Sequence, residues 1–180
     1  MKYKKLIVSI IVVAFIVPVI AISYLFLNDR GSIQRDDQGG IFDVKKITYN
    51  IEGNSYYLAT APNSVLTMFG EPVFGDLDSD GDLDAAVLLA HAPGGSGTFY
   101  YASFAINNGN GYKSTNSFLL GDRIAPQTVE YHDGTVVYNF AVRKDGEPMT
   151  ARPSVGKSVW VSFDASSGLI TGSDNDGSSI

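Results

Sequence analysis

The sequence predicts a mainly β protein, with one compact antiparallel sheet or sandwich-like domain behind an N-terminal transmembrane helix. Three observations lead to this prediction. Several segments after residue 41 alternate apolar and polar side chains with a period of two, as half-buried strands do. Turn signals containing glycine, aspartate or asparagine separate these segments. The N-terminus differs from the rest because it contains a long uncharged apolar run.

The apolar run covers residues 6–27. At about 1.5 Å per residue it is long enough to cross a hydrocarbon core about 30 Å thick. Lys2, Lys4 and Lys5 precede it, so the positive-inside rule places the N-terminus in the cytoplasm. A cleaved signal peptide is the alternative, but its apolar region usually spans only about 7–15 residues. We therefore expect a single-pass anchor in the cell membrane with the C-terminal domain outside; cleavage would instead give a secreted domain.

Composition shifts divide the chain into four predicted parts. The short segments on either side of the β-rich region are polar and contain glycine without apolar periodicity, which is typical of linkers and tails. The predicted parts are a cytoplasmic tip and transmembrane signal anchor (1–28), a flexible stalk (29–40), a β-rich extracytoplasmic domain (41–171) and a disordered tail (172–180).

The first half of the predicted domain contains a hairpin and two central strands. Segments 46–51 and 55–60 flank the turn sequence EGN, and 64–69 is a further expected strand. The segment AAVLLA (85–90) is apolar on both faces, and 98–107 carries large side chains on both faces. We expect these two segments to be neighbouring central strands, because only a strand covered on both sides is apolar throughout.

The second half continues the antiparallel pattern. After a turn at 108–112, a short strand is expected at 117–121. Segments 127–132 and 135–143 flank Asp133 and Gly134, which is the clearest hairpin signal in the chain. The segment 158–163 also alternates. No segment after the apolar run shows a helical period.

Composition also excludes several kinds of chemistry. The chain has no cysteine, which excludes disulfides, thiolate nucleophiles, cysteine-ligated zinc and lipoprotein anchoring. Three of the 13 basic residues and none of the 19 acidic residues lie in the first 28 positions, so the remainder has a net charge of −9. A domain with this charge does not attract nucleic acid.

The stretch DLDSDGDLD, residues 76–84, carries the most specific motif. Aspartates occupy every second position, at Asp76, Asp78, Asp80, Asp82 and Asp84. On a regular strand these like charges would share one face and repel one another. Gly81 permits a left-handed turn, so the chain can wrap and direct its oxygens at one point. Calcium requires about 6–8 oxygen ligands, so we expect one bound Ca²⁺; a solvated acidic turn is the alternative.

The spacing of these aspartates distinguishes between classes of calcium loop. An EF-hand requires a bidentate glutamate at its twelfth position, where this chain has Val87. The pattern D-x-D-x-D-G-x-x-D after Phe74 and Gly75 resembles instead the calcium loop of FG-GAP and VCBS-type repeats. That resemblance implies that Asp76, Asp78, Asp80 and Asp84 are side-chain ligands and that Asp82 contributes its carbonyl. A propeller is not expected, because the chain contains only one such repeat.

Three further segments carry a second resemblance. In order after the aspartates, GGSGTFYY (94–101), GDRIAPQT (121–128) and PMTARPSVGKS (148–158) resemble a family of small exported bacterial domains of unassigned function. The resemblance covers most of residues 42–170. It implies an exported bacterial domain and transfers no activity and no catalytic residue.

The remaining polar candidates do not form a recognisable catalytic motif. Ser96 lies in GGSGT, which is neither G-x-S-x-G nor a phosphate loop, because no G-K-[ST] follows. His91 and His132, the only histidines, lack metal-ligand spacing, and we expect both at the surface. Three arginines could form an anion site, although pairing with the excess acids is the better expectation; they are Arg123, Arg143 and Arg152.

Aromatic side chains could form a binding face for a glycan or peptide. The candidates are Tyr56, Tyr57, Tyr100, Tyr101, Tyr112 and Trp160. Adjacent strand residues point to opposite faces, so at most half of them can share one surface, and ordinary sheet packing is the alternative.

Two functional classes follow from these features. The first, which we favour, is a membrane-tethered binding or structural module of the bacterial cell surface, with a calcium-stabilised loop and an extracellular protein or glycan as ligand. The second is a hydrolase acting on cell-envelope or extracellular polymers. A hydrolase would need a polar cleft with two acids, or a His–Ser pair, away from the aspartate loop.

Overall fold

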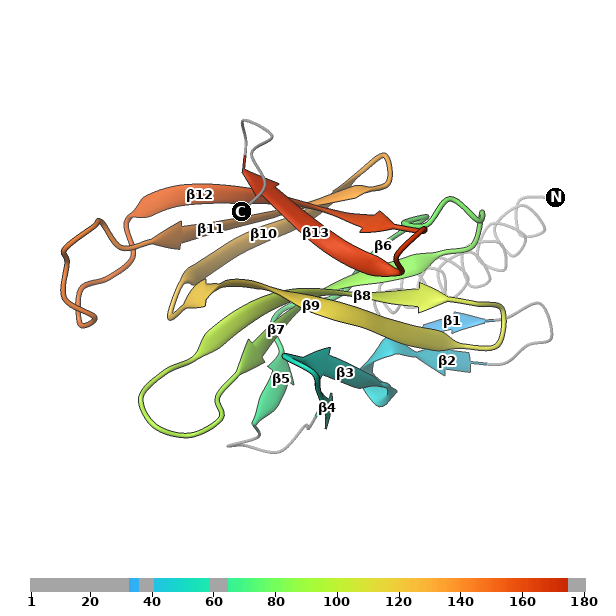
Figure 1. The fold of residues 1–180 in the computed structure, drawn as a ribbon, viewed down its shortest axis with the longest axis horizontal. Coiled ribbons are helices and arrows are strands. Elements are labelled where there is room, and N and C mark those ends of the chain that lie inside the picture. Colours follow the sequence, from blue (N-terminus) through green and yellow to red (C-terminus); the bar gives the residue numbers. More distant parts are fainter. Residues whose placement is uncertain (1–32, 36–40, 59–64, 175–180) are drawn as a thin grey trace, which may run out of the picture.

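The computed structural model describes residues 33–35, 41–58 and 65–174, and these form antiparallel sheets with almost no helix (Figure 1). The predicted β class is therefore confirmed. Two sheets make up most of the fold. The central sheet contains β5 (Leu66–Met68), β6 (Val73–Gly75), β7 (Asp84–His91), β8 (Phe99–Asn107) and β9 (Tyr112–Asp122). The outer sheet contains β10 (Ala125–His132), β11 (Thr135–Val142), β12 (Val155–Asp164) and β13 (Leu169–Asp174).

The two sheets pack face to face as a sandwich. Strand β10 lies beside β6 at one edge, and β13 lies beside β9 at the other. The core between them contains large fully buried side chains, including Phe104 from the central sheet and Tyr138 and Phe140 from the outer sheet. The Tyr138 hydroxyl donates to the carbonyl of Val87 at 3.1 Å, so its polar atom is satisfied inside the core.

A third layer covers the other face of the central sheet. The hairpin of β3 (Thr48–Ile51) and β4 (Asn54–Tyr57) packs Tyr49 and Ile51 against Val87, Leu89 and Tyr101. Consequently β7 has apolar neighbours on both sides, which explains its unbroken apolar sequence. The register of β7 with β8 runs from Ala85 opposite Ala105 to His91 opposite Phe99, so the two predicted central strands are indeed neighbours.

Both predicted hairpins are present. Glu52 and Gly53 join β3 to β4, and both have positive φ angles (51° and 83°). Asp133 and Gly134 join β10 to β11, with φ angles of 47° and 79°. Two successive residues with positive φ match the right-handed twist of the flanking strands, which is why glycine occupies the second position.

Several boundaries differ from those predicted. Strand β9 begins at Tyr112 rather than at 117, and β13 continues to Asp174, beyond the boundary expected at 171. The second difference follows from the pairing of β13 with β12, in which Gly172 lies opposite Val161 and Asp174 lies opposite Val159. The Phe118 ring also packs on Gly172, where a Cβ would lie only 2.5 Å from it. His91 is also buried, with 6% of its surface exposed, rather than lying at the surface as predicted.

The N-terminal part is described only in short pieces. Strand β1 (Ile33–Arg35), inside the predicted stalk, pairs with β2 (Ile41–Asp43), which is followed by a 3-10 turn at Val44–Lys46. The predicted membrane segment at 6–27 and the tail after 174 lie outside the described residues. Within the described ranges, no helix is long and apolar enough to span a membrane.

Candidate metal centre

The aspartate loop connects two paired strands. Gly75 at the end of β6 pairs with Asp84 at the start of β7, so the ends of the loop lie side by side. The chain from Asp76 to Leu83 must therefore form a closed turn. Gly81 has a φ of 94°, in agreement with the left-handed conformation that its position in the motif predicts.

Asp84 anchors the loop from inside the protein. Its side chain is fully buried, and its two carboxylate oxygens accept hydrogen bonds from different parts of the chain. The Leu77 amide donates to Oδ2 at 2.8 Å, and the Asn107 amide donates to Oδ1 at 2.8 Å. Asp84 therefore ties the loop to the end of β8, and each of its oxygens keeps a lone pair for a further ligand.

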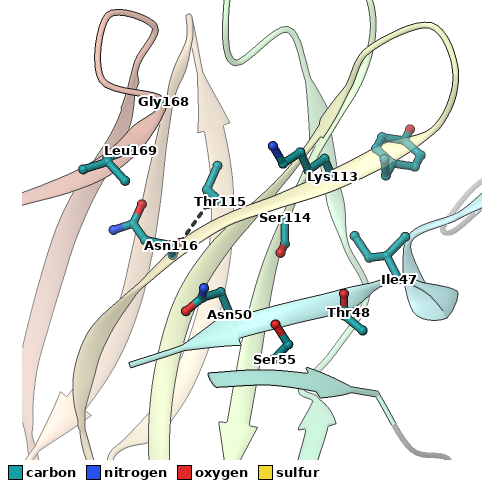
Figure 2. Close-up of a pocket in the computed structure, with 11 residues that line it drawn as sticks. Ile47, Thr48, Asn50, Ser55, Lys113, Ser114, Thr115, Asn116, Gly168 and Leu169 are labelled. Atoms are coloured by element: carbon teal, nitrogen blue, oxygen red, sulfur yellow. Dashed lines mark hydrogen bonds between the residues drawn. The ribbon is translucent and has the colours of Figure 1, made fainter. Parts of the chain in front are cut away.

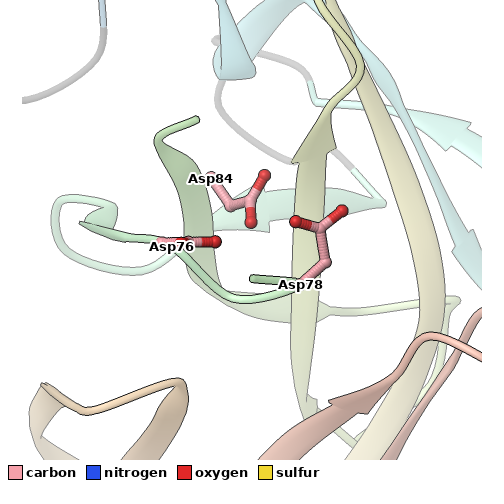
Figure 3. A group of neighbouring side chains, drawn as sticks. All are labelled: Asp76, Asp78 and Asp84. Carbon is pink, nitrogen blue, oxygen red and sulfur yellow. The ribbon is translucent and has the colours of Figure 1, made fainter. Parts of the chain in front are cut away.

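Asp76 and Asp78 direct their carboxylates toward Asp84 (Figure 3). One oxygen from each of the three residues lies within 4.8 Å of the others. Two oxygens that both bind a calcium ion at about 2.4 Å can be at most about 4.8 Å apart, so the three oxygens are close enough to share one ion. In addition, Asp76 Oδ1 is buried and has no hydrogen-bond partner among the described residues. A buried carboxylate oxygen without a partner is costly, and a cation would satisfy it.

Asp80 and Asp82 do not join this group. Both are exposed, and Asp80 Oδ1 accepts a hydrogen bond from the Asp82 amide at 2.8 Å. Asp78 Oδ1 likewise accepts from the Asp80 amide at 3.1 Å, and Asp76 Oδ2 from Gly81 at 3.2 Å. These hydrogen bonds build the turn itself. Of the four carboxylates that the sequence resemblance implies as ligands, the structure thus brings three together and leaves that of Asp80 at the outside of the loop; for Asp82 the resemblance implies only a carbonyl ligand.

The electrostatics of the group favour a positive charge. Burial raises the pKa of Asp84 to about 6, and the charges of Asp78 and Asp80 add to this rise, while the two backbone hydrogen bonds oppose it. Burial also raises the pKa of Asp78, with neighbouring aspartates contributing. Carboxylates in this arrangement destabilise one another unless a proton or a cation is shared between them.

Two tyrosines hold the ends of the loop. The Tyr131 hydroxyl on β10 donates to the carbonyl of Asp76 at 3.0 Å, and the Tyr112 hydroxyl on β9 donates to the carbonyl of Leu83 at 3.1 Å. Gly75 permits the first contact, since a Cβ there would lie 2.5 Å from the Tyr131 ring. The sequence did not predict that Tyr131 and Tyr112 support the loop, because each of these hydrogen bonds joins residues far apart in the chain.

The motifs of the second resemblance meet at the opposite end of the sandwich. Asp122 Oδ1 accepts from the Thr98 amide at 3.1 Å and pairs with Arg123. Arg143 donates to the carbonyls of Arg123 at 2.9 Å and Ala151 at 2.7 Å. Arg123 therefore pairs with an acid, as expected, whereas Arg143 binds backbone carbonyls. Through these contacts the motif residues hold together three loops, which join β7 to β8, β9 to β10 and β11 to β12.

Two hollows bear on the hydrolase alternative. The larger, about 420 Å³, lies between the β3–β4 hairpin and β9 (Figure 2). It is lined by Ile47, Thr48, Asn50, Ser55, Tyr112, Lys113, Ser114, Thr115, Asn116, Gly168 and Leu169, with no aspartate, glutamate or histidine. The smaller, about 150 Å³, lies between β10 and the residues around β6, and Glu71 is the one acid in its lining. Neither hollow contains two acids or a His–Ser pair.

The candidate aromatic residues lie on different surfaces. Tyr101 is buried under the β3–β4 hairpin, and its hydroxyl donates to Glu52 Oε1 at 2.8 Å. Tyr57 is 71% exposed on β4, whereas Trp160 is 38% exposed on β12 of the outer sheet. The six aromatic side chains therefore do not form a single face.

Comparison of the chain with protein-family models, with curated proteins and with solved structures finds no match in any of the three. The likeness of the Asp76–Asp84 loop to FG-GAP and VCBS-type repeats, and that of the other segments to exported bacterial domains, remain predictions from the sequence.

Proposed function

We propose that this protein is a binding or structural module of the bacterial cell surface, tethered to the membrane by residues 6–27, and that one calcium ion in the Asp76–Asp84 loop stabilises it. The observation that supports the calcium site most directly is the convergence of Asp76, Asp78 and Asp84, with a buried and unpaired oxygen on Asp76. The tether is supported by the length of the uncharged run and by the lysines before it.

Calcium suits the group better than magnesium does. The three carboxylates come from an irregular turn and from a strand end, and calcium accepts such flexible geometry at 2.3–2.6 Å. Magnesium demands a tighter octahedral shell and retains its water. Loop carbonyls and water would complete the coordination. No bidentate glutamate closes the loop, so the dissociation constant should be on the order of 10⁻⁴–10⁻³ M, as in extracellular modules.

The ion would act on stability through the start of β7. Asp84 is the first residue of this central strand, and its carboxylate also holds the end of β8. A ligand that binds only the native state at about 100 times its dissociation constant stabilises that state by roughly 2.7 kcal/mol. Calcium should therefore raise the melting temperature of the whole domain.

The experiment measures calcium binding by calorimetry and thermal unfolding of the metal-free full chain. We expect one ion per chain, with magnesium giving a much smaller shift in melting temperature. Asp78→Asn should weaken calcium binding at least ~10-fold, because the amide removes one ligand charge while it keeps an acceptor for the Asp80 amide.

Asp82→Asn is the matched control. The Asp82 side chain lies outside the group, so this variant should bind calcium nearly as the natural chain does. Identical melting temperatures with calcium and with chelator would refute the calcium site. Equal weakening by both substitutions would show that calcium responds only to the overall negative charge of the loop.

A further inference from the structure

The outward side of the outer sheet carries an organised group of side chains around the only tryptophan in the chain. Along β11, Val136, Tyr138 and Phe140 point into the core, so the alternate residues point outward. The pairing of β11 with its neighbours then places a row of outward side chains together, which includes Thr135, Val137, Ser162 and six others. We call these six the Trp160 face: Thr128, Glu130, His132, Asn139, Ser158 and Trp160.

The polar members of this face are joined by hydrogen bonds across three strands. Ser158 Oγ donates to Asn139 Oδ1 at 2.6 Å, and Asn139 Nδ2 donates to Thr128 Oγ1 at 2.9 Å. Thr128 Oγ1 in turn donates to Glu130 Oε1 at 2.6 Å. These contacts hold exposed side chains in one arrangement. A ligand that binds there need not pay the full entropic cost of ordering them.

The aromatic part of the face lies next to this network. His132 Nε2 is 3.5 Å from Glu130 Oε2, and the His132 ring centroid is 5.8 Å from that of Trp160. Trp160 is 38% exposed, while Val137 between Glu130 and Trp160 is nearly covered. The face therefore offers one partly exposed aromatic side chain bordered by polar atoms, rather than the cluster of apolar anchors typical of a protein interface core.

The hydrogen-bonding capacity that remains on the face is mainly that of acceptors. The hydroxyls of Thr128 and Ser158 have already donated their protons within the network, but they keep lone pairs. The hydrogen bond from Thr128, with smaller contributions from His132 and Asn139, holds the pKa of Glu130 below its usual value, so the carboxylate is an acceptor too. A fitting ligand must therefore carry several hydroxyl donors.

The charge of the face restricts the ligand further. None of its six side chains is a lysine or an arginine, and Glu130 is its single acid. The chain as a whole has a net charge of −6. An anionic ligand would meet repulsion without a compensating cation, whereas a neutral one would not.

We propose that the Trp160 face binds a neutral glycan, with a pyranose ring stacked on the indole and its hydroxyls bonded to Asn139, Glu130 and Thr128. The C–H face of an equatorially substituted pyranose is flat and apolar, and it complements an exposed indole. This inference rests on the proposed role as a binding module and gives that role a ligand class.

The test titrates the full chain with cellotetraose and with chitotetraose in a detergent that has no sugar headgroup. Because Trp160 is the only tryptophan, fluorescence excited selectively at tryptophan, beyond the absorption of the ten tyrosines, reports on this face alone. We expect a saturable change in emission with at least one tetrasaccharide. Calorimetry measures the same binding in variants that lack the fluorophore.

The variants separate this face from other surfaces. Trp160→Ala should weaken binding at least ~10-fold, and Asn139→Ala should weaken it by a smaller factor. Tyr57→Ala removes an aromatic side chain that is 71% exposed on another layer, and it should leave binding unchanged. Cooperative thermal unfolding of the same samples shows whether each variant is folded, independently of calcium.

Three outcomes would overturn the inference. The first is the absence of binding up to about 10 mM of either sugar, well above the weak millimolar range, by a chain that unfolds cooperatively. That result would remove the glycan site, and calcium stabilisation measured on the same chain decides the calcium proposal separately. The second is full binding by Trp160→Ala. The third is a fluorescence change that depends on protein concentration without sugar, which would assign the face to self-association.

Discussion

Replacing Asn116 by alanine should destabilise the sandwich by opening one of its edges. Asn116 lies on β9, the edge strand of the central sheet, and it contacts β13, the edge strand of the outer sheet. Its Oδ1 accepts from the Ile170 amide at 2.8 Å, and its Nδ2 donates to the Ile170 carbonyl at 3.2 Å. One side chain thus serves both polar groups of a residue in the other sheet.

The structure gives the size of the expected effect. Each hydrogen bond contributes about 1 kcal/mol net, so the loss of both should cost about 2 kcal/mol. Unfolding entropy is roughly 2.1 cal/mol/K per residue, or about 0.3 kcal/mol/K for the ~130 described residues. The melting temperature should therefore fall by about 7 °C. Asn116→Asp should be at least as damaging, because it places a carboxylate oxygen against the Ile170 carbonyl.

Urea unfolding and amide hydrogen exchange provide the assay. The midpoint should fall with an unchanged slope, and exchange at the Ile170 amide should accelerate more than exchange at the central strands. Asn110→Ala is the matched control, because Asn110 is exposed in the turn between β8 and β9. A loss below about 0.5 kcal/mol for Asn116→Ala, or an equal loss for the control, would mean that this contact does not hold the sheets together.

Three further predictions concern packing, pH and topology. Gly172→Ala should lower the free energy of unfolding by about 1–3 kcal/mol in denaturant, because its Cβ would meet the Phe118 ring. Gly156 has open space around it, so Gly156→Ala is the control and should not destabilise the protein. Equal losses of stability in the two variants would contradict this packing. Burial lowers the pKa of His91 in the native state. The unfolded chain therefore binds a proton at a higher pH than the native state does, and the free energy of unfolding should fall as pH drops below about 6.5. His91→Phe should flatten this pH dependence, and a variant with the same pH profile as the natural chain would contradict the role of His91. If residues 6–27 form an uncleaved anchor, the protein keeps its N-terminal methionine and stays with membranes in high salt; a mature N-terminus near residue 24 would refute the anchor.

The local pattern was sufficient to predict much of the fold. Alternation and the turn residues predicted both hairpins, because those signals depend on neighbours in the chain and on the φ angles that glycine permits. The segment 85–90 identified a doubly covered central strand, and the spacing of the aspartates located the candidate metal group. The sequence could not separate Asp78 from Asp80, since the side-chain orientation depends on the turn hydrogen bonds.

The sequence by itself determined the β class, the hairpins, the two central strands and the loop in which the acids converge. These features follow from periodicity and from local backbone preference, which short segments carry on their own. The tertiary structure alone decided that His91 is buried, that Tyr131 and Tyr112 support the loop, that Asn116 joins the two sheets, and that the Trp160 face comes together. Each of these depends on which strand lies opposite which, and that arrangement is set by the packing of the three layers around β7.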